Sequence, residues 1–176
     1  MIFRETELKG AYLIDIEPVH DERGFFARTF CREEFARYGL HGDFVQSNVS
    51  FNRLKGTLRG MHYQAAPHEE IKLIRVTRGS VYDVIIDIRP DSRTVGQWTA
   101  VELSAENRRM LYVPKGFAHG FQTLEDNTEV WYHMSEYYHP ESARGLRWDD
   151  PAIRMYWPLQ VQCISERDTT FPDFRP

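Results

Sequence analysis

The chain has 176 residues, of which 41% are hydrophobic and 14% aromatic, and its formal net charge at pH 7 is −4. This length and apolar content suit a single domain, residues 1–176, with a substantial buried core. Lysines and arginines are interspersed among acids, which argues against a nucleic-acid partner because phosphate backbones select strongly basic faces.

The cysteines and the N-terminus indicate the compartment. Cys31 and Cys163 lie far apart in the sequence and in no metal-binding spacing, so free thiols in a reducing cytoplasm are favoured over a disulfide scaffold. Residues 1–7 are charged too early for a signal peptide. No apolar run approaches the roughly 20 residues that span a bilayer. We therefore expect a soluble, cytoplasmic protein without a membrane partner.

Short apolar, β-branched and aromatic runs recur between turn residues, which is the pattern of strands. In chain order, strands are expected at 11–16, 25–30, 44–51, 56–64, 71–77, 80–88, 97–103, 109–113, 120–124 and 128–134. The connections expected between them are a turn at 21–24, a helix at 32–38 that Gly39 ends, a tight hairpin at 78–79 and a single helical turn at 104–107. Many short strands with almost no helix predict an all-β fold, and we expect an antiparallel jelly-roll β-barrel with a few short peripheral helices.

The segment from Tyr137 onward is rich in proline, tryptophan and aspartate rather than in strand formers. Aromatic residues such as Trp148 and Trp157 are expected to pack this irregular tail onto the barrel. No linker tract or internal repeat separates it from the rest of the chain.

The most informative segment is 58–64, which places a titratable imidazole, His62, near cationic side chains on an expected strand. His62 can act as a base near neutral pH, and Arg59 or Lys72 can stabilise an oxyanion. Taken alone, His62 also fits a buried histidine satisfied by a hydrogen bond, and Lys72 fits a solvated lysine on an edge strand. Lys72 lies in an apolar run, however, and a lysine that points into a barrel needs an anion or a substrate.

A second distinctive segment, 114–121, contains a Pro-x-Gly-x-x-His arrangement that delivers His119 to the start of a strand. It resembles half of the metal-binding pattern of cupins, whose other half requires a His-x-His pair. Gln64 stands where the second imidazole should be, and His68 and Glu69 have no convincing ligand register. Two imidazoles without a clear third ligand argue against a metal centre.

Two further titratable residues carry little signal in isolation. Tyr132 lies on an expected strand, where an ordinary core or rim tyrosine is common, and Asp168 lies in the tail, where a surface acid is common. No sequence spacing brings either of them to His62.

Taken together, these motifs resemble the dTDP-4-dehydrorhamnose 3,5-epimerase family, a cupin-fold group that acts on nucleotide-linked 4-keto sugars. The resemblance covers nearly the whole chain, and its specificity comes from many motifs in the same order. They are 21–26, 46–48, 58–64, Lys72, 83–89, 114–121, 148–151, 157–158 and 165–168.

The resemblance implies a role for each residue. His62 would remove the proton on the carbon next to the ketone, with Asp168 orienting and charging its imidazole. Lys72 would stabilise the enolate oxygen, and Tyr132 would deliver a proton from the opposite face. The positions that match substrate-binding residues are Arg23, Gln46, Asn48, Arg59, His119, Tyr138, which would stack on the base, and Arg167, which would contact the nucleotide.

This chemistry is consistent with the residues present. A C4 ketone acidifies the hydrogens on C3 and C5, and the enolate needs an electrostatic partner rather than a redox cofactor, so no cofactor and no metal are expected. Members of the family are homodimers in which an N-terminal segment reaches the neighbour's site. That arrangement would place Arg23 in the partner's site.

Two departures from the family pattern bear on the substrate. The family commonly carries Glu at the positions of Arg28 and Ala143, and both acids are associated with substrate binding. A CDP-linked or other nucleotide sugar, a single-centre epimerase and a 4-keto-sugar isomerase therefore remain alternatives. A metal-dependent cupin enzyme is disfavoured by Gln64, and a non-catalytic sugar-binding module by the opposed acid and base, which binding alone does not need.

Overall fold

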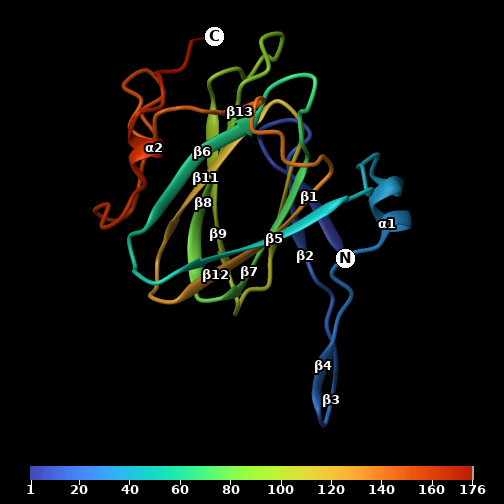
Figure 1. Ribbon diagram of the computed structural model, residues 1–176. Coiled ribbons are helices and arrows are strands. Elements are labelled where there is room, and N and C mark those ends of the chain that lie inside the picture. The colour runs from blue at the N-terminus through green and yellow to red at the C-terminus, as the bar shows by residue number, and fades with distance from the viewer. Residues whose placement is uncertain (176) are drawn as a thin grey trace.

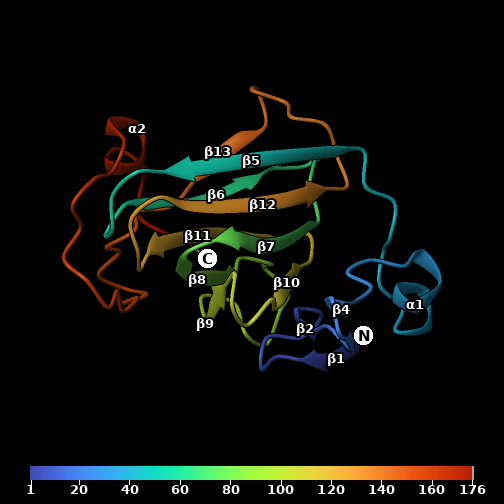
Figure 2. The same ribbon diagram turned by 90° about the horizontal axis from the view of Figure 1, so that it is seen from below.

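The computed structural model of the protein describes residues 1–175. Two antiparallel sheets face one another across the core (Figures 1 and 2). In spatial order, the first contains β1 (Ile2–Glu5), β2 (Tyr12–Asp15), β10 (Met110–Val113), β7 (Lys72–Arg78), β12 (Thr128–Met134) and β5 (Gln46–Asn52). The second contains β13 (Ala143–Gly145), β6 (Leu58–Gln64), β11 (Phe117–Thr123), β8 (Ser80–Asp87) and β9 (Trp98–Ser104). A separate hairpin, β3 (Val19–Asp21) with β4 (Gly24–Phe26), and two short helices, α1 (Arg32–Arg37) and α2 (Glu166–Thr169), complete the fold. The predicted all-β class is confirmed. Among the described strands, no pairing joins the two large sheets into a closed barrel.

The core lies between the sheets and follows the two-residue period of the strands. Ile74 on β7 and Val130 on β12 pack against Val81 and Ile85 on β8 in one fully buried cluster. Burial of each such side chain contributes about 1.5–3 kcal/mol relative to exposure. Leu73 points the other way, into a second cluster beneath α1. Both faces of β7 are therefore covered at this point.

Most of the predicted strands are found within a few residues of their predicted bounds, and 128–134 coincides with β12. The expected strand at 25–30 was too long: β4 ends at Phe26, and Phe30 packs against Phe35 and Phe44 outside any sheet. The strand expected at 120–124 begins earlier, because β11 pairs with β8 from Phe117 onward. The strands β1, β3 and β13 and the helix α2 were not predicted.

Two predicted connections were wrong. Residues 78–79 do not close a hairpin, because β7 and β8 belong to different sheets and Gly79 carries the chain across at φ +72°. The segment 104–107 is a turn rather than a helical turn. There the Ser104 hydroxyl accepts from the Asn107 N–H, and the Asn107 side chain accepts from the Ser104 N–H.

The C-terminal tail packs on the second sheet, as predicted. The Trp157 indole donates to the Trp148 carbonyl at 2.8 Å, and Phe174 packs on the apolar cluster of the second sheet's outer face. The Leu58 N–H donates to the Cys163 carbonyl at 2.8 Å, so the tail runs beside the start of β6. Cys31 and Cys163 are both free thiols, as predicted. Within residues 1–175, no helix has the length and apolar character needed to cross a membrane.

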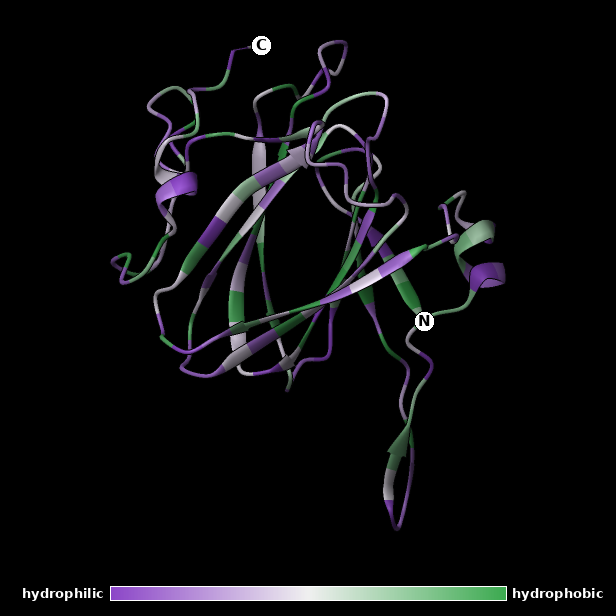
Figure 3. Ribbon diagram, in the orientation of Figure 1, coloured by the Kyte–Doolittle hydropathy of each residue, from purple (hydrophilic) through white to green (hydrophobic). Residues whose placement is uncertain are grey.

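The β3–β4 hairpin projects away from the sheets (Figure 1). Its predicted turn at 21–24 is confirmed, with Asp21 opposite Gly24 and the Asp21 carboxylate accepting from the Arg23 N–H. Val19 is 70% exposed and Phe26 is 75% exposed, which leaves large apolar side chains in solvent. Figure 3 shows this apolar character on β4, whereas the turn at the tip of the hairpin is hydrophilic.

Candidate active site

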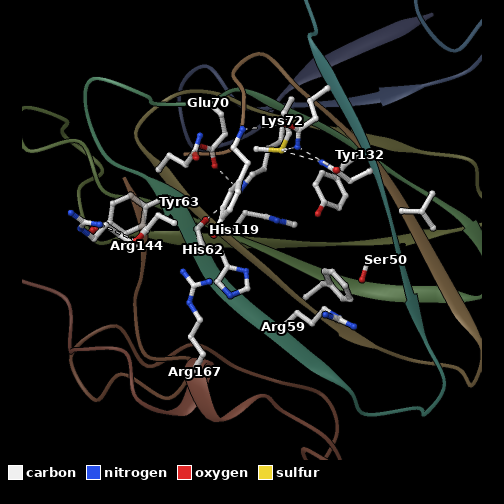
Figure 4. A pocket seen from close by; sticks show the side chains of 18 of the residues that line it. Ser50, Arg59, His62, Tyr63, Glu70, Lys72, His119, Tyr132, Arg144 and Arg167 are labelled. Carbon is white, nitrogen blue, oxygen red and sulfur yellow. Dashed lines mark hydrogen bonds and ion pairs between the residues drawn. The ribbon is translucent and has the colours of Figure 1, made fainter. Parts of the chain in front are cut away.

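A cavity of about 530 Å³ opens between the two sheets (Figure 4). Every residue predicted for the site except Arg23 and Asp168 lines it. The second sheet contributes Arg59, His62 and His119, the first contributes Gln46, Asn48, Lys72 and Tyr132, and the tail and a loop contribute Arg167 and Tyr138. The topology thus gathers side chains that are far apart in the sequence.

Asp168 lies directly behind His62. The His62 Nε2 is 2.8 Å from the Asp168 Oδ1, and the Gly60 N–H donates to the Oδ2 at 3.1 Å. The Ser165 side chain caps α2 by accepting from the Asp168 N–H, which fixes the carboxylate. Burial alone would raise the pKa of Asp168, but the hydrogen bond and charge of His62 and the N–H of Gly60 hold it below its usual value. Because an ionised carboxylate only accepts, the imidazole proton lies on Nε2, and Nδ1 is left as the proton acceptor.

Gly60 makes this arrangement sterically possible. Its φ is +128°, and a Cβ at this position would lie 2.5 Å from the Gly120 Cα. The strands β6 and β11 therefore approach very closely, and His62 is in register with His119 across them. The glycine that follows Arg59 in the sequence is required for this approach, and its backbone N–H then bonds to Asp168.

Tyr132 reaches the cavity from the opposite sheet. It lies on β12, in register with Asn48 on β5 and with Ile74 on β7. Burial raises the pKa of the Tyr132 phenol, with Arg59 opposing and Glu70 adding to that effect, so the phenol stays protonated at neutral pH. His62 and Tyr132 therefore line the cavity from facing sheets (Figure 4).

Lys72 points into the cavity and is buried, with 8% exposure. The Lys72 Nζ pairs with the Glu70 Oε1 at 2.9 Å and donates to the His62 carbonyl at 3.4 Å. Of the two orientations that the sequence leaves open for this lysine, the structure has the one that faces inward. Glu70 was not singled out from the sequence, although a carboxylate two residues before a buried lysine is a recognisable signal for an ion pair.

The cavity carries an excess of positive charge. Arg59, Lys72, Arg144 and Arg167 all line it, against one acid, Glu70, among its described lining residues. Arg144 was not predicted from the sequence. A confined positive field of this kind suits a ligand with several negative charges, such as a diphosphate.

His119 is held by a second carboxylate that the sequence reasoning missed. The His119 Nε2 lies 2.9 Å and 3.1 Å from the two oxygens of Asp83, which is fully buried on β8. The pair joins residues 36 apart in the sequence, and no spacing rule reveals it. The contact fixes the ring of His119 at the cavity wall.

Gln64, which stands where a cupin metal ligand would be, uses its amide to organise two loops. Its Nε2 donates to the carbonyls of His68 and Tyr137 at 2.9 and 3.1 Å, and its Oε1 accepts from the His139 N–H at 2.6 Å. Nearby, the Gln46 Oε1 accepts from the Tyr138 N–H at 3.2 Å. These amides hold the loop that carries Tyr138.

One group within residues 1–175 has the chemistry of metal ligands: His68, Glu136 and His139, whose ligand atoms lie within 4.8 Å of one another. The two imidazole rings are stacked, with centroids 3.5 Å apart and planes 11° from parallel. Nitrogen lone pairs lie in the ring planes, so the lone pairs of parallel stacked rings do not converge on one ion. The group also lies outside the residues that line the cavity.

Arg23 and Arg28 are not at the cavity of their own chain. Arg23 lies at the tip of the β3–β4 hairpin with its side chain 90% exposed, and its assignment to a partner's site stays a prediction. Arg28 pairs with Glu34 at 2.7 Å beside α1. Ala143, by contrast, lines the cavity. Of the two departures from the family pattern, only Ala143 changes the wall of this cavity.

Comparison with known proteins gives matches along the whole chain. A model of the dTDP-4-dehydrorhamnose 3,5-epimerase family matches residues 5–176. The dTDP-4-dehydrorhamnose 3,5-epimerase of Methanothermobacter thermautotrophicus (strain Delta H) is 46% identical over 176 residues, which cover 98% of this chain and 94% of that protein.

Two crystal structures extend this match to the fold. The dTDP-4-dehydrorhamnose 3,5-epimerase of Bacillus anthracis, with TDP and PPi bound, has a TM-score of 0.95 at 40% identity and covers 98% of this chain and 99% of its own. The dTDP-6-deoxy-D-glucose-3,5-epimerase of Legionella pneumophila, in complex with dTDP-4-keto-L-rhamnose, has a TM-score of 0.91 at 40% identity, with 98% and 92% coverage.

Proposed function

The chain belongs to the dTDP-4-dehydrorhamnose 3,5-epimerase family, and we propose that it inverts C3, C5 or both of a dTDP-linked 4-keto-6-deoxyhexose, as a step in the biosynthesis of a deoxysugar of the rhamnose type. The observation that carries the proposal is the placement of the His62–Asp168 pair and of Tyr132 on facing sheets around one cavity.

The proposed reaction starts at the carbon next to the C4 ketone. The Nδ1 of His62 takes the proton from this carbon, the C–H electron pair moves into the enolate, and Asp168 stabilises the imidazolium that forms. Lys72 stabilises the negative enolate oxygen. Tyr132 then gives its phenolic proton to the same carbon from the opposite face, which inverts the centre. No atom changes oxidation state over the cycle, and solvent restores the proton on Tyr132 and removes the one on His62.

The cationic residues provide the proposed nucleotide site. Arg59 and Arg167 would contact the diphosphate, and Tyr138, half exposed at the cavity edge, would stack on the base. The Bacillus anthracis relative binds TDP. Gln46 and Asn48, adjacent on β5 and joined by a 3.3 Å hydrogen bond, would hold the sugar with His119.

We further propose that two copies form a homodimer. Large apolar side chains exposed on the β3–β4 hairpin, including Val19 and Phe26, gain from burial against a second copy. Such docking would carry Arg23 toward the partner's cavity and add a further cation there. The free thiols Cys31 and Cys163 fit a cytoplasmic setting.

The test of the function is NMR of dTDP-4-keto-6-deoxyglucose incubated with the protein in D₂O. Deuterium at both C3 and C5 indicates a double epimerase, and deuterium at one carbon indicates a single-centre enzyme. Exchange that occurs only with a CDP- or UDP-linked analogue would point to a different nucleotide. A product in which the ketone has moved would identify an isomerase.

His62→Ala should abolish exchange at both carbons while dTDP still binds, because the substitution removes only the base. If this variant retains normal exchange, the mechanism is wrong. If the unaltered protein acts on none of the 4-keto sugars, the proposed function is wrong.

A further inference from the structure

Glu70 is the acid among the described cavity-lining residues, in a site that otherwise selects anions. It lies two residues before β7 begins and is buried, with 8% exposure of the residue and 4% of its side chain. A carboxylate in such a place repels the diphosphate substrate of the proposed function and loses its hydration. Both effects are unfavourable, so its presence requires a specific partner.

That partner is Lys72. The Glu70 Oε1 lies 2.9 Å from the Lys72 Nζ, and Lys72 is itself buried. The other oxygen of Glu70, Oε2, is buried and makes no hydrogen bond to any described residue. The interactions of the carboxylate are therefore concentrated on the ammonium group.

The geometry also limits where the ammonium group can point. An ammonium group has three N–H donors. The Lys72 ammonium pairs with Glu70 at 2.9 Å and donates to the His62 carbonyl at 3.4 Å, and it still has donor capacity for a ligand in the cavity. The contact to the His62 backbone places the charge beside the strand that carries the base (Figure 4).

We propose that Glu70 is a positioning residue of the reaction: its carboxylate fixes the Lys72 ammonium group where the enolate oxygen forms. The inference rests on the proposed function, because the enolate is its intermediate. Glu70 need not touch the substrate, since its action passes through Lys72. The negative charge of Glu70 also favours the protonated form of Tyr132, the proposed acid.

A purely structural ion pair would behave differently. Its loss would lower the melting temperature and leave the turnover of the folded enzyme unchanged. A positioning role requires a loss in kcat at nearly constant KM, because Lys72 acts on charge that develops only in the transition state.

The first experiment is a double-mutant cycle with Glu70→Ala and Lys72→Met, using the rate of deuterium exchange into the 4-keto sugar. In the background with Lys72, Glu70→Ala should lower kcat about tenfold or more, with KM changed by less than about twofold. In the Lys72→Met background, the same change at Glu70 should alter the residual rate by less than about twofold. Glu70→Gln, which keeps an acceptor oxygen, should recover part of the lost kcat, and Glu69→Gln, the same charge change one residue away, should have no effect.

The second experiment needs no turnover. Amine acylation, followed site by site by mass spectrometry, compares Lys72 with the exposed Lys9, Lys55 and Lys115 in the same molecule. In Glu70→Ala, Lys72 should be acylated faster relative to the other three, because its amino group is no longer held by the carboxylate. Glu69→Gln should leave the ratio unchanged.

The outcomes separate the two proposals. Equal losses from Glu70→Ala with and without Lys72, or wild-type kcat in folded Glu70→Ala, would overturn the positioning role. If the unaltered enzyme acts on no 4-keto sugar, the proposed function fails, and the acylation ratio still decides whether Glu70 controls Lys72. An unchanged ratio there would overturn the inference as well.

Discussion

Replacing Asp168 with Asn should nearly abolish turnover while leaving the fold intact. Both oxygens of Asp168 accept hydrogen bonds, one from the His62 Nε2 at 2.8 Å and one from the Gly60 N–H at 3.1 Å. An asparagine has one carbonyl oxygen and one amide nitrogen, so it cannot accept both bonds. If its oxygen stays on Gly60, its N–H₂ faces His62, and the imidazole must turn its Nε2 lone pair to it. The proton then moves to Nδ1, the atom that must accept one from the substrate.

The expected loss follows from two effects that act together. The imidazole is held in the wrong tautomer, and the imidazolium formed on proton abstraction loses its carboxylate. In a serine protease the equivalent Asp-to-Asn change costs about 10⁴ in kcat. We therefore expect a drop of about 10³–10⁴, which corresponds to about 4–5.5 kcal/mol in activation free energy.

The assay is the initial rate of deuterium incorporation at C3 and C5, measured by NMR, with calorimetry of dTDP binding as the second readout. The dissociation constant for dTDP should change by less than about twofold, because Asp168 lies behind His62 and does not line the cavity. Glu166→Gln, a neutralisation on the exposed side of the same short helix, is the matched control. An Asp168→Asn variant that turns over within tenfold of the unaltered enzyme would refute the proposed role.

Three further predictions test other parts of the structure. Tyr132→Phe should still exchange deuterium through His62, but formation of the inverted product should fall about 10²-fold or more, because the proton donor on the opposite face is gone. NMR of the product measures this loss, and full inversion would rule out Tyr132 as the acid. Gly145→Ala should lower the free energy of unfolding in urea by about 1–3 kcal/mol. The added Cβ would lie 2.3 Å from the ring of Phe171, which packs edge-on to His62. A stable, fully active variant would refute this packing. Bonds from Arg89, Ser92 and Thr94 outweigh burial and lower the pKa of Asp87 to about 2, so its stabilisation is present above pH ~4 and lost as the pH falls through about 2. The stability difference between the unaltered protein and Asp87→Asn should therefore shrink by about 2 kcal/mol over that interval, and a constant difference would contradict the shift.

The sequence predicted those parts of the fold that local patterns encode. The apolar and aromatic run at 128–134 identified β12 to the residue, and the strand pairs along its whole length with β5 and β7 on its two edges. β1, β3 and β13 have only three or four residues each, and their formation depends on pairing with strands elsewhere in the chain. The connection through Gly79 was misread because a two-residue turn between strands looks the same whether the strands pair or separate into two sheets.

The site was predictable to a similar degree. The apolar residues around Lys72 raised the possibility that it faces inward but left a solvated lysine open, and the structure buries it. Asp168 lies 106 residues after His62, and only the family resemblance assigned it to the imidazole. The contact depends on the tail lying beside β6, where the Leu58 N–H donates to the Cys163 carbonyl. A bond between backbone atoms leaves no side-chain pattern in the sequence. Asp83 behind His119 was missed for the same reason.

Two sheets that face each other can hold a base and an acid on opposite sides of a substrate, as epimerisation requires. Inversion requires the proton to leave one face of a carbon and arrive at the other, so base and acid must be held apart with the substrate between them. Here the proposed base, His62, belongs to β6 and is held by the tail through Asp168, whereas the proposed acid, Tyr132, belongs to β12 and is kept protonated by burial. Because the two groups are supported by different parts of the chain, a change in the tail should affect proton removal without affecting proton delivery.

Gly145→Ala tests that separation. It should slow deuterium exchange and product formation by the same factor, since the step it disturbs comes before the one that Tyr132 performs. A larger loss of product than of exchange would show that the tail also supports the acid.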